Sequence, residues 1–279
     1  MSWESLIAPF TEEPIPWFST ALVIFAAWLM GFSRSGLGAG GFVVSPLTVL
    51  AVGADDGLAI IAVIMIPAGA IGCWQHRKAL ERQWLNPLIP AAFFGTILGG
   101  LVLWMIISSG EMSIVHRRLE FVVAGLSLLY VVLVSFRDKI VKLGGGSGPP
   151  SSKGVFTFGC LLAISQTVAN SGTPLLTVYF IRHGITKERF VAAQNAFLTV
   201  QNTIKVVPFL ILGLLHLGNA GAALLLFPLT LVGSWCGKHF YQMASERVYF
   251  GCYIALLVIG FLSSAILIWG RTNFYHLFH

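Results

Sequence analysis

Charged residues are scarce in this sequence. Only 10% of its 279 residues are charged, whereas a soluble globular domain carries about 25%. Hydrophobic residues, in contrast, make up 56% of the chain. This balance excludes a soluble enzyme or binding domain. It is typical of a protein whose helices cross a membrane several times.

Cysteine motifs are also missing. The chain has no Cys-x-x-Cys pair and no Cys/His cluster, and its four cysteines are scattered through apolar runs at Cys73, Cys160, Cys236 and Cys252. Such spacing argues against a disulfide framework or a zinc site, and we expect neither a metal nor another cofactor. The net charge of +6 is interpreted as a topology signal rather than as a nucleic-acid surface, so no nucleic-acid partner is expected.

Six apolar stretches are long enough to cross a hydrocarbon core of about 30 Å. They are 56–73, 87–108, 119–136, 189–214, 219–240 and 248–270. Two further apolar regions, 17–53 and 154–182, are interrupted at 33–41 and 165–174. The legs beside each interruption have about 10 to 15 residues and cover only about 15–22 Å. Each region is therefore either one broken helix that crosses or a hairpin that re-enters.

The loop Lys and Arg residues favour hairpins. If both regions cross, these residues divide into eight on one side and seven on the other, but two hairpins divide them into twelve and three. Cytoplasmic loops are enriched in Lys and Arg. We therefore predict two hairpins in a bacterial inner membrane, with both termini periplasmic and the linker 144–153 cytoplasmic.

The sequence contains an internal repeat. Pro90-x4-Gly95-x3-Gly99 recurs as Pro228-x4-Gly233-x3-Gly237, and Ser33-Arg34-Ser35 aligns with Ser165-Gln166-Thr167. We predict an all-α polytopic membrane protein with two halves, 1–143 and 154–279. Each half comprises one re-entrant or broken helical hairpin and three transmembrane helices, about eight membrane segments in all. Because each half crosses an odd number of times, the repeats have inverted topology, as in many transporters.

Two cations fall inside apolar segments. Arg34 lies at the first interruption and Lys205 lies in the 189–214 span, while none of the eleven acidic residues is in mid-span. Intramembrane charges usually mark a transport pathway, and a bound anion would neutralise these two. The planar guanidinium of Arg34 suits an oxyanion. Two alternatives stay open: Arg34 satisfies backbone carbonyls, and Lys205 extends to the outer interface.

The interruptions supply further candidates for the binding site. Their glycines let a ligand approach the backbone, and helix N-termini at about Gly40 and Gly172 would attract an anion. The polar row of the 189–214 span either lines a cavity or joins helices. The candidate binding residues are Ser33, Arg34, Ser35, Gly38, Gly40, Gly41, Gln166, Asn170, Ser171, Gly172, Thr173, Gln194, Asn195, Gln201, Asn202 and Lys205.

The run GLGAGGFVVSPL, Gly36 to Leu47, resembles the first repeat of the sulfite exporter TauE/SafE family. These are membrane permeases with two related halves, and the resemblance extends to length, span layout and repeat spacing. The second half departs from the family pattern, because SQTVANSGTP stands where a glycine run usually recurs. The resemblance implies a permease rather than an enzyme, one that exports sulfite or organosulfonates and binds them at 33–41 and 166–174.

Three functions are compatible with these residues. The preferred one is a secondary transporter for a small sulfur-containing anion in a lipid bilayer, either as a single chain or as a homodimer. The second is a channel for anions or small solutes, because opposed hairpins also build pores. The third, which ranks last, is a membrane protein that transfers sulfur through a cysteine.

Overall fold

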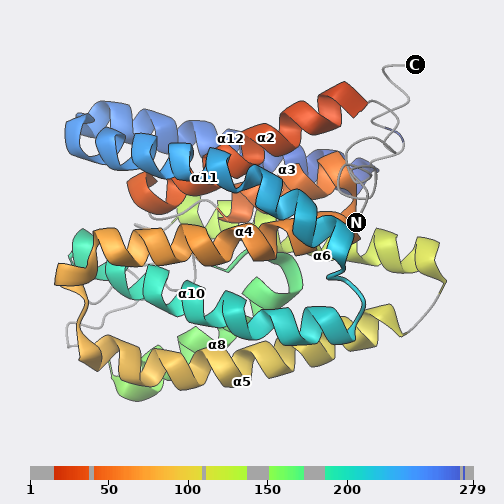
Figure 1. The fold of residues 1–279 in the computed structure, drawn as a ribbon, viewed down its shortest axis with the longest axis horizontal. Coiled ribbons are helices and arrows are strands. Elements are labelled where there is room, and N and C mark those ends of the chain that lie inside the picture. The colour runs from red at the N-terminus through yellow and green to blue at the C-terminus, as the bar shows by residue number, and fades with distance from the viewer. Residues whose placement is uncertain are drawn as a thin grey trace.

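The computed structural model of the protein describes residues 16–37, 41–108, 111–136, 151–172, 186–270 and 273, and all regular structure in these ranges is helical. The long helices lie side by side along the bundle (Figure 1). They are α2 (Pro16–Phe32), α3 (Gly41–Val52), α4 (Ala54–Gln75), α5 (Arg82–Ile107), α6 (Met112–Ser135), α8 (Ser152–Ala169), α10 (Lys187–Ile211), α11 (Leu217–Met243) and α12 (Glu246–Trp269). Two short elements are η1 (Ser33–Leu37), a π-helix, and η2 (Arg77–Ala79), a 3-10 helix.

The structure has one helix over each of the six segments interpreted as spans. Among the described residues, five helical stretches are long and apolar enough to cross a membrane: Pro16–Leu37, Ala54–Gln75, Leu85–Ile107, Leu217–Met243 and Gly251–Trp269. Helices α6 and α10 have similar lengths but more polar sequences. The prediction of an all-helical protein with several membrane-spanning helices is confirmed.

The first interrupted region differs from its prediction in where the helix ends. Helix α2 continues through η1, so the first leg has 22 residues rather than about 10 to 15 and is long enough to cross the membrane. The second leg, α3, has only 12 residues, or about 18 Å. A π-turn takes one extra residue into the helical turn, and such turns are frequent at functional sites. Ser33 and Gly36 weaken an α-helix, but here the helix widens before it ends.

Helix α3 is buried along its whole length. It packs against α2, α4, α6 and α12, and Figure 1 shows it between the helices of the bundle. A helix that is apolar on all sides belongs in the protein interior rather than against lipid. The apolar core therefore forms around α3, and this fixes the inner end of α2 with its π-turn.

Helix α2 lies against α11 along a seam of glycines. A Cβ atom added to Gly233 would collide with the carbonyl oxygen of Trp28, and one added to Gly237 would collide with that of Phe32. These contacts leave no room for a side chain. The two helix backbones are therefore in direct contact along this seam.

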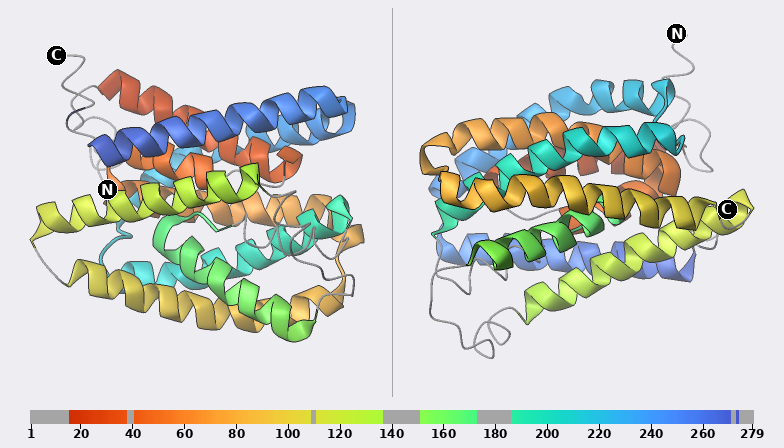
Figure 2. Two further views of the ribbon diagram at one scale, coloured as in Figure 1. Left: turned by 180° about the vertical axis from the view of Figure 1, so that it is seen from behind. Right: turned by 90° about the horizontal axis from the view of Figure 1, so that it is seen from below.

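Helix α8 lies against α5 in the same way, as Figure 2 shows. A Cβ atom on Gly95 would lie 2.6 Å from the carbonyl oxygen of Cys160, and one on Gly99 would lie 3.1 Å from that of Ile164. The repeated Pro-x4-Gly-x3-Gly motif thus marks the two seams at which α2 and α8 dock.

Ion pairs join helices at both ends of the bundle. Where α4 begins, Asp55 pairs with His116 of α6, and Asp56 pairs at 3.2 Å with His216, the residue before α11. At the far end of α4, Glu81 in the α4–α5 connection pairs with Arg189 of α10 at 2.8 Å. Helix α10 therefore begins at the same end of the bundle as the α4–α5 connection.

Candidate functional site

Arg34 lies on the π-turn η1 and is 3% exposed. None of its three guanidinium nitrogens has a hydrogen-bond partner among the residues that the structure describes. The buried hydroxyls of Ser33 and Ser35 also have no partner there. The described residues therefore give no support to the alternative in which Arg34 satisfies backbone carbonyls. A buried cation without acceptors is costly, so this position calls for a ligand or water.

The π-turn is held in place by α11. A Cβ atom on Gly36 would lie 2.8 Å from the carbonyl oxygen of Gly237, so η1 and α11 both need glycine where they meet. Next to this contact, the rings of Phe32 and Phe240 pack with centroids 5.2 Å apart. The seam between α2 and α11 thus ends at the residues beside Arg34 and fixes their depth in the bundle.

Lys205 of α10 is fully buried and bonded to the end of α8. Its Nζ donates to the carbonyl oxygen of Gln166 at 3.0 Å and to Oδ1 of Asn170. Asn170 caps α8 in a left-handed conformation, with φ 50°. The last carbonyls of a helix lack partners and form its negative end, so a cation there is stabilising. Lys205 points into the protein and not toward the outer interface.

The two cations interact across the interior. The positive charge of Arg34 acts electrostatically on Lys205. In the described part of the chain, neither side chain forms an ion pair with a carboxylate. Lys205 is bonded to the end of α8, whereas Arg34 has no hydrogen-bond partner among the described residues. Arg34 and Lys205, which the sequence analysis treated as a pair, therefore differ in their hydrogen bonding.

The polar row of α10 consists of Gln194, Asn195, Gln201 and Asn202, and it is buried. These side chains therefore need hydrogen-bond partners inside the protein. Gln201 donates to Thr167 of α8 at 3.0 Å and to Thr96 of α5 at 3.4 Å, which joins three helices. Asn195 donates to the backbone oxygen of Arg34 at 3.5 Å. Asn202 donates to the carbonyl of Leu198 at 2.6 Å. The fourth residue of the row, Gln194, is also buried. The row was predicted either to line a cavity or to join helices. Gln201 joins helices, whereas Asn195 contacts the backbone of Arg34.

The second interruption is built around the end of α8. Gln166 donates to the sulfur of Met65 at 3.0 Å, and Asn170 donates to the carbonyl of Leu58 at 2.9 Å, so both side chains contact α4. The hydroxyl oxygen of Ser171 lies 3.2 Å from that of Ser127, so the Ser171 side chain faces α6. A Cβ atom on Gly172 would lie 2.7 Å from the carbonyl of Leu162. Gln166 and Asn170 thus meet Lys205, and no described contact brings Ser171 or Gly172 to it.

Four candidate glycine and threonine positions remain to be placed. Gly41 is the first residue of α3 and is buried, which agrees with a helix beginning near this point. Gly38, Gly40 and Thr173 lie outside the described residues.

Three contact residues were missed in the sequence. Thr167 and Thr96 hold Gln201, and Met65 accepts from Gln166. Thr167 had a signal, because it aligns with Ser35 in the internal repeat. Thr96 and Met65 had none, since each lies within an apolar span and gains its role only from the helix that packs on it.

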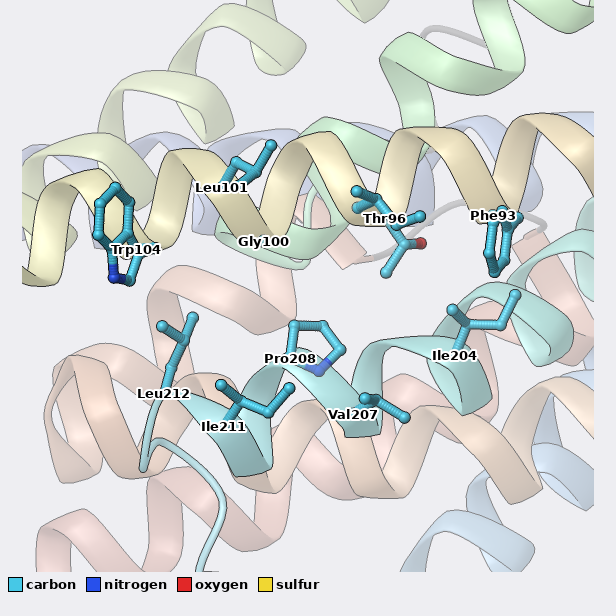
Figure 3. Close-up of a pocket in the computed structure, with 11 residues that line it drawn as sticks. Phe93, Thr96, Gly100, Leu101, Trp104, Ile204, Val207, Pro208, Ile211 and Leu212 are labelled. Carbon is cyan, nitrogen blue, oxygen red and sulfur yellow. The ribbon is translucent and has the colours of Figure 1, made fainter.

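A groove between α5 and α10 lies on the surface of the bundle and is apolar. In Figure 3, Phe93 and Trp104 of α5 face Ile204 and Ile211 of α10 across it. Its lining residues include Leu101 and Val207, which are more than half exposed. Thr96 is the lining residue that also contacts the polar row. The groove has no cation and suits lipid chains rather than an anion.

The profile of the sulfite exporter TauE/SafE family matches residues 23–264, which is most of the chain. The chain belongs to the sulfite exporter TauE/SafE family. The match spans η1, the end of α8 and the polar row of α10. No match is found among curated proteins or among solved structures. Membership of the TauE/SafE family agrees with a multi-pass membrane transporter that acts on a small anion within the bilayer.

Proposed function

We propose that this protein is a secondary transporter that exports a small sulfur-containing anion, sulfite or an organosulfonate, across the bacterial inner membrane. The observation that carries the proposal is Arg34, which is buried and lacks an acceptor among the described residues. An oxyanion supplies both the negative charge and the acceptors, and the guanidinium gives it paired hydrogen bonds. The anion would bind near the midplane, between η1 and the end of α8.

Export of this kind needs no coupling carboxylate. The membrane potential drives an anion outward with about 2.3 kcal/mol per charge for each 100 mV, so a uniporter is sufficient. Among the described residues, the one buried acidic side chain is Glu120. It pairs with Arg117 at 3.2 Å and with neither of the two interior cations.

We infer that both interrupted regions are hairpins. The ion pair between Glu81 and Arg189 supports this for the second region, because it joins the α4–α5 connection to the start of α10 at one end of the bundle. A second region that crosses would put these residues on opposite sides of the membrane. The first region precedes both residues, so its hairpin rests on the division of the loop Lys and Arg residues. With hairpins, both termini are periplasmic and the linker 144–153 is cytoplasmic.

A homodimer stays an expectation that light scattering of the purified protein tests.

An inverted repeat is part of this proposal, and the packing of the helices supports it. The contact of α2 with α11 has a counterpart in that of α8 with α5, and the contact of α4 with α11 has one in that of α10 with α5. Helices α4 and α10 pack on each other, as do α6 and α12. This pattern is expected when a two-fold axis exchanges the two halves, whether the repeat is inverted or parallel, and the inversion itself rests on the hairpins.

The test is anion flux into proteoliposomes under an imposed membrane potential, with sulfite and sulfonates as substrates. We expect flux that saturates and follows the potential. R34Q should reduce it by about a hundredfold, because losing the charged partner of a buried ion typically costs about 2–5 kcal/mol. The matched control is R82Q at an exposed position of α5. Full flux in R34Q would contradict the assignment, and fast flux that does not saturate would favour a channel.

A further inference from the structure

Three amide side chains of α10 have a buried oxygen atom without a donor. Oδ1 of Asn195, Oε1 of Gln201 and Oδ1 of Asn202 have no hydrogen-bond partner among the described residues. All three side chains are at most 1% exposed. A buried acceptor without a donor is unfavourable by about 1–3 kcal/mol, so three on one helix need an explanation.

The orientation of each amide is set by what its nitrogen contacts. Asn195 and Asn202 donate to backbone carbonyls, which only accept. Gln201 donates to the hydroxyl of Thr167, whose own proton goes to the carbonyl of Ala163 at 2.7 Å. Exchanging oxygen and nitrogen would place two acceptors against each other in every case. The groups without partners are therefore acceptors and cannot serve as donors to an anion.

Two of these amide residues, Asn195 and Asn202, lie near a buried cation. The nitrogen of Asn195 touches the backbone of Arg34, and the amide packs on Gly72 of α4, where a Cβ atom would lie 2.6 Å from it. Asn202 precedes Lys205 by three residues, so the two share a face of α10. A simple oxyanion offers only acceptors and would leave these oxygens unsatisfied. A metal cation could bind them but would be repelled by Arg34 and Lys205.

We propose that the transported anion carries a hydrogen-bond donor, a hydroxyl or an ammonium group, which the amide oxygen of Asn195 accepts while Arg34 holds the anionic group. This rests on the proposed function and narrows its substrate class. The site then selects donor-bearing anions over those of the same charge and size that lack a donor. A binding site built to accept a hydrogen bond discriminates strongly against a ligand without one.

Transport of 2-hydroxyethanesulfonate and of ethanesulfonate in proteoliposomes tests this. The two anions have the same charge and nearly the same size, but only the first has a donor. We expect the wild-type protein to half-saturate at a concentration at least about tenfold lower for the hydroxylated anion. In N195L the preference for the hydroxylated anion should disappear. The control, N86L, changes an exposed asparagine of α5 and should keep the preference.

The outcomes separate the two proposals. Equal half-saturation of the two sulfonates in the wild-type protein would overturn the donor assignment and leave the transporter standing, with water on the amides. Sodium-dependent flux without a preference would also overturn it, because the amide oxygens would then hold the ion. Absence of flux for both sulfonates and for sulfite would overturn the transporter and this inference together. The wild-type comparison needs no variant, so a misfolded N195L leaves the test intact.

Discussion

At the scale of single residues, Arg34 and Lys205 are equally buried but differently satisfied. The Nζ of Lys205 bonds to the end of α8, where it completes the cap of that helix. The guanidinium of Arg34 has no partner among the described residues. Burial of an unpaired charge destabilises a fold, and such a residue is retained when function needs it. Lys205 therefore positions α8, whereas we propose that Arg34 binds the transported anion.

This difference predicts opposite effects on stability. R34M should raise the unfolding temperature of the ligand-free protein in detergent, by about 3–10 °C, because it removes an uncompensated buried charge. K205M should lower it, because Gln166 and Asn170 each lose a donor, at about 1–3 kcal/mol each. Both variants should lose flux. The measurement is thermal unfolding at a fixed scan rate. A fall in stability for R34M equal to that for K205M would mean that Arg34 is structural.

At the scale of helices, the glycine seams of α5 and α11 determine where α8 and α2 lie. Gly233 faces the carbonyl oxygen of Trp28, and Gly95 faces that of Cys160. At Gly251 of α12, in contrast, packing does not require glycine, since an added Cβ atom there would meet nothing within 4 Å. The seams control the depth of η1, and so of Arg34, and the depth of the α8 end that Lys205 contacts.

Alanine substitutions should separate these two kinds of glycine. G233A and G95A should each lower the free energy of unfolding by about 1–3 kcal/mol or more, because a methyl group would overlap backbone atoms across the seam. G251A should be neutral or stabilising by up to about 1 kcal/mol, since alanine favours a helix. Thermal unfolding and anion flux of the three variants provide the check. A destabilised G251A with an unchanged G233A would contradict the claim that packing at the α2–α11 seam requires glycine.

Much of the helix arrangement could be predicted from the sequence, because long apolar runs and the Pro-x4-Gly-x3-Gly repeat are local signals. The widening of α2 at η1 could not, because Ser33 and Gly36 weaken an α-helix without showing whether it widens or stops. The direction of Lys205 could not either. It depends on Asn170, 35 residues away, and on α8 ending beside α10. Side chains that serve another helix are beyond any local pattern.

At the scale of the whole molecule, the ends of the bundle carry its charged contacts. One end holds the pairs of Asp55 with His116 and of Asp56 with His216. The other end holds the pair of Glu81 with Arg189. If the regions 17–53 and 154–182 are hairpins, this second end is the one rich in Lys and Arg and faces the cytoplasm. With hairpins α12 runs antiparallel to α4, whereas two crossings would make these helices parallel.

Single cysteines introduced into a cysteine-free background test this topology. K78C, beyond the end of α4, and R247C, at the start of α12, should both react with a membrane-impermeant maleimide only in inside-out vesicles. E111C, just before α6, should react only in right-side-out vesicles. The four native cysteines are replaced by serine, and retained flux shows that this background is folded. Labelling of R247C from the side opposite to K78C would mean that the second interrupted region crosses, and the inverted repeat would then be wrong.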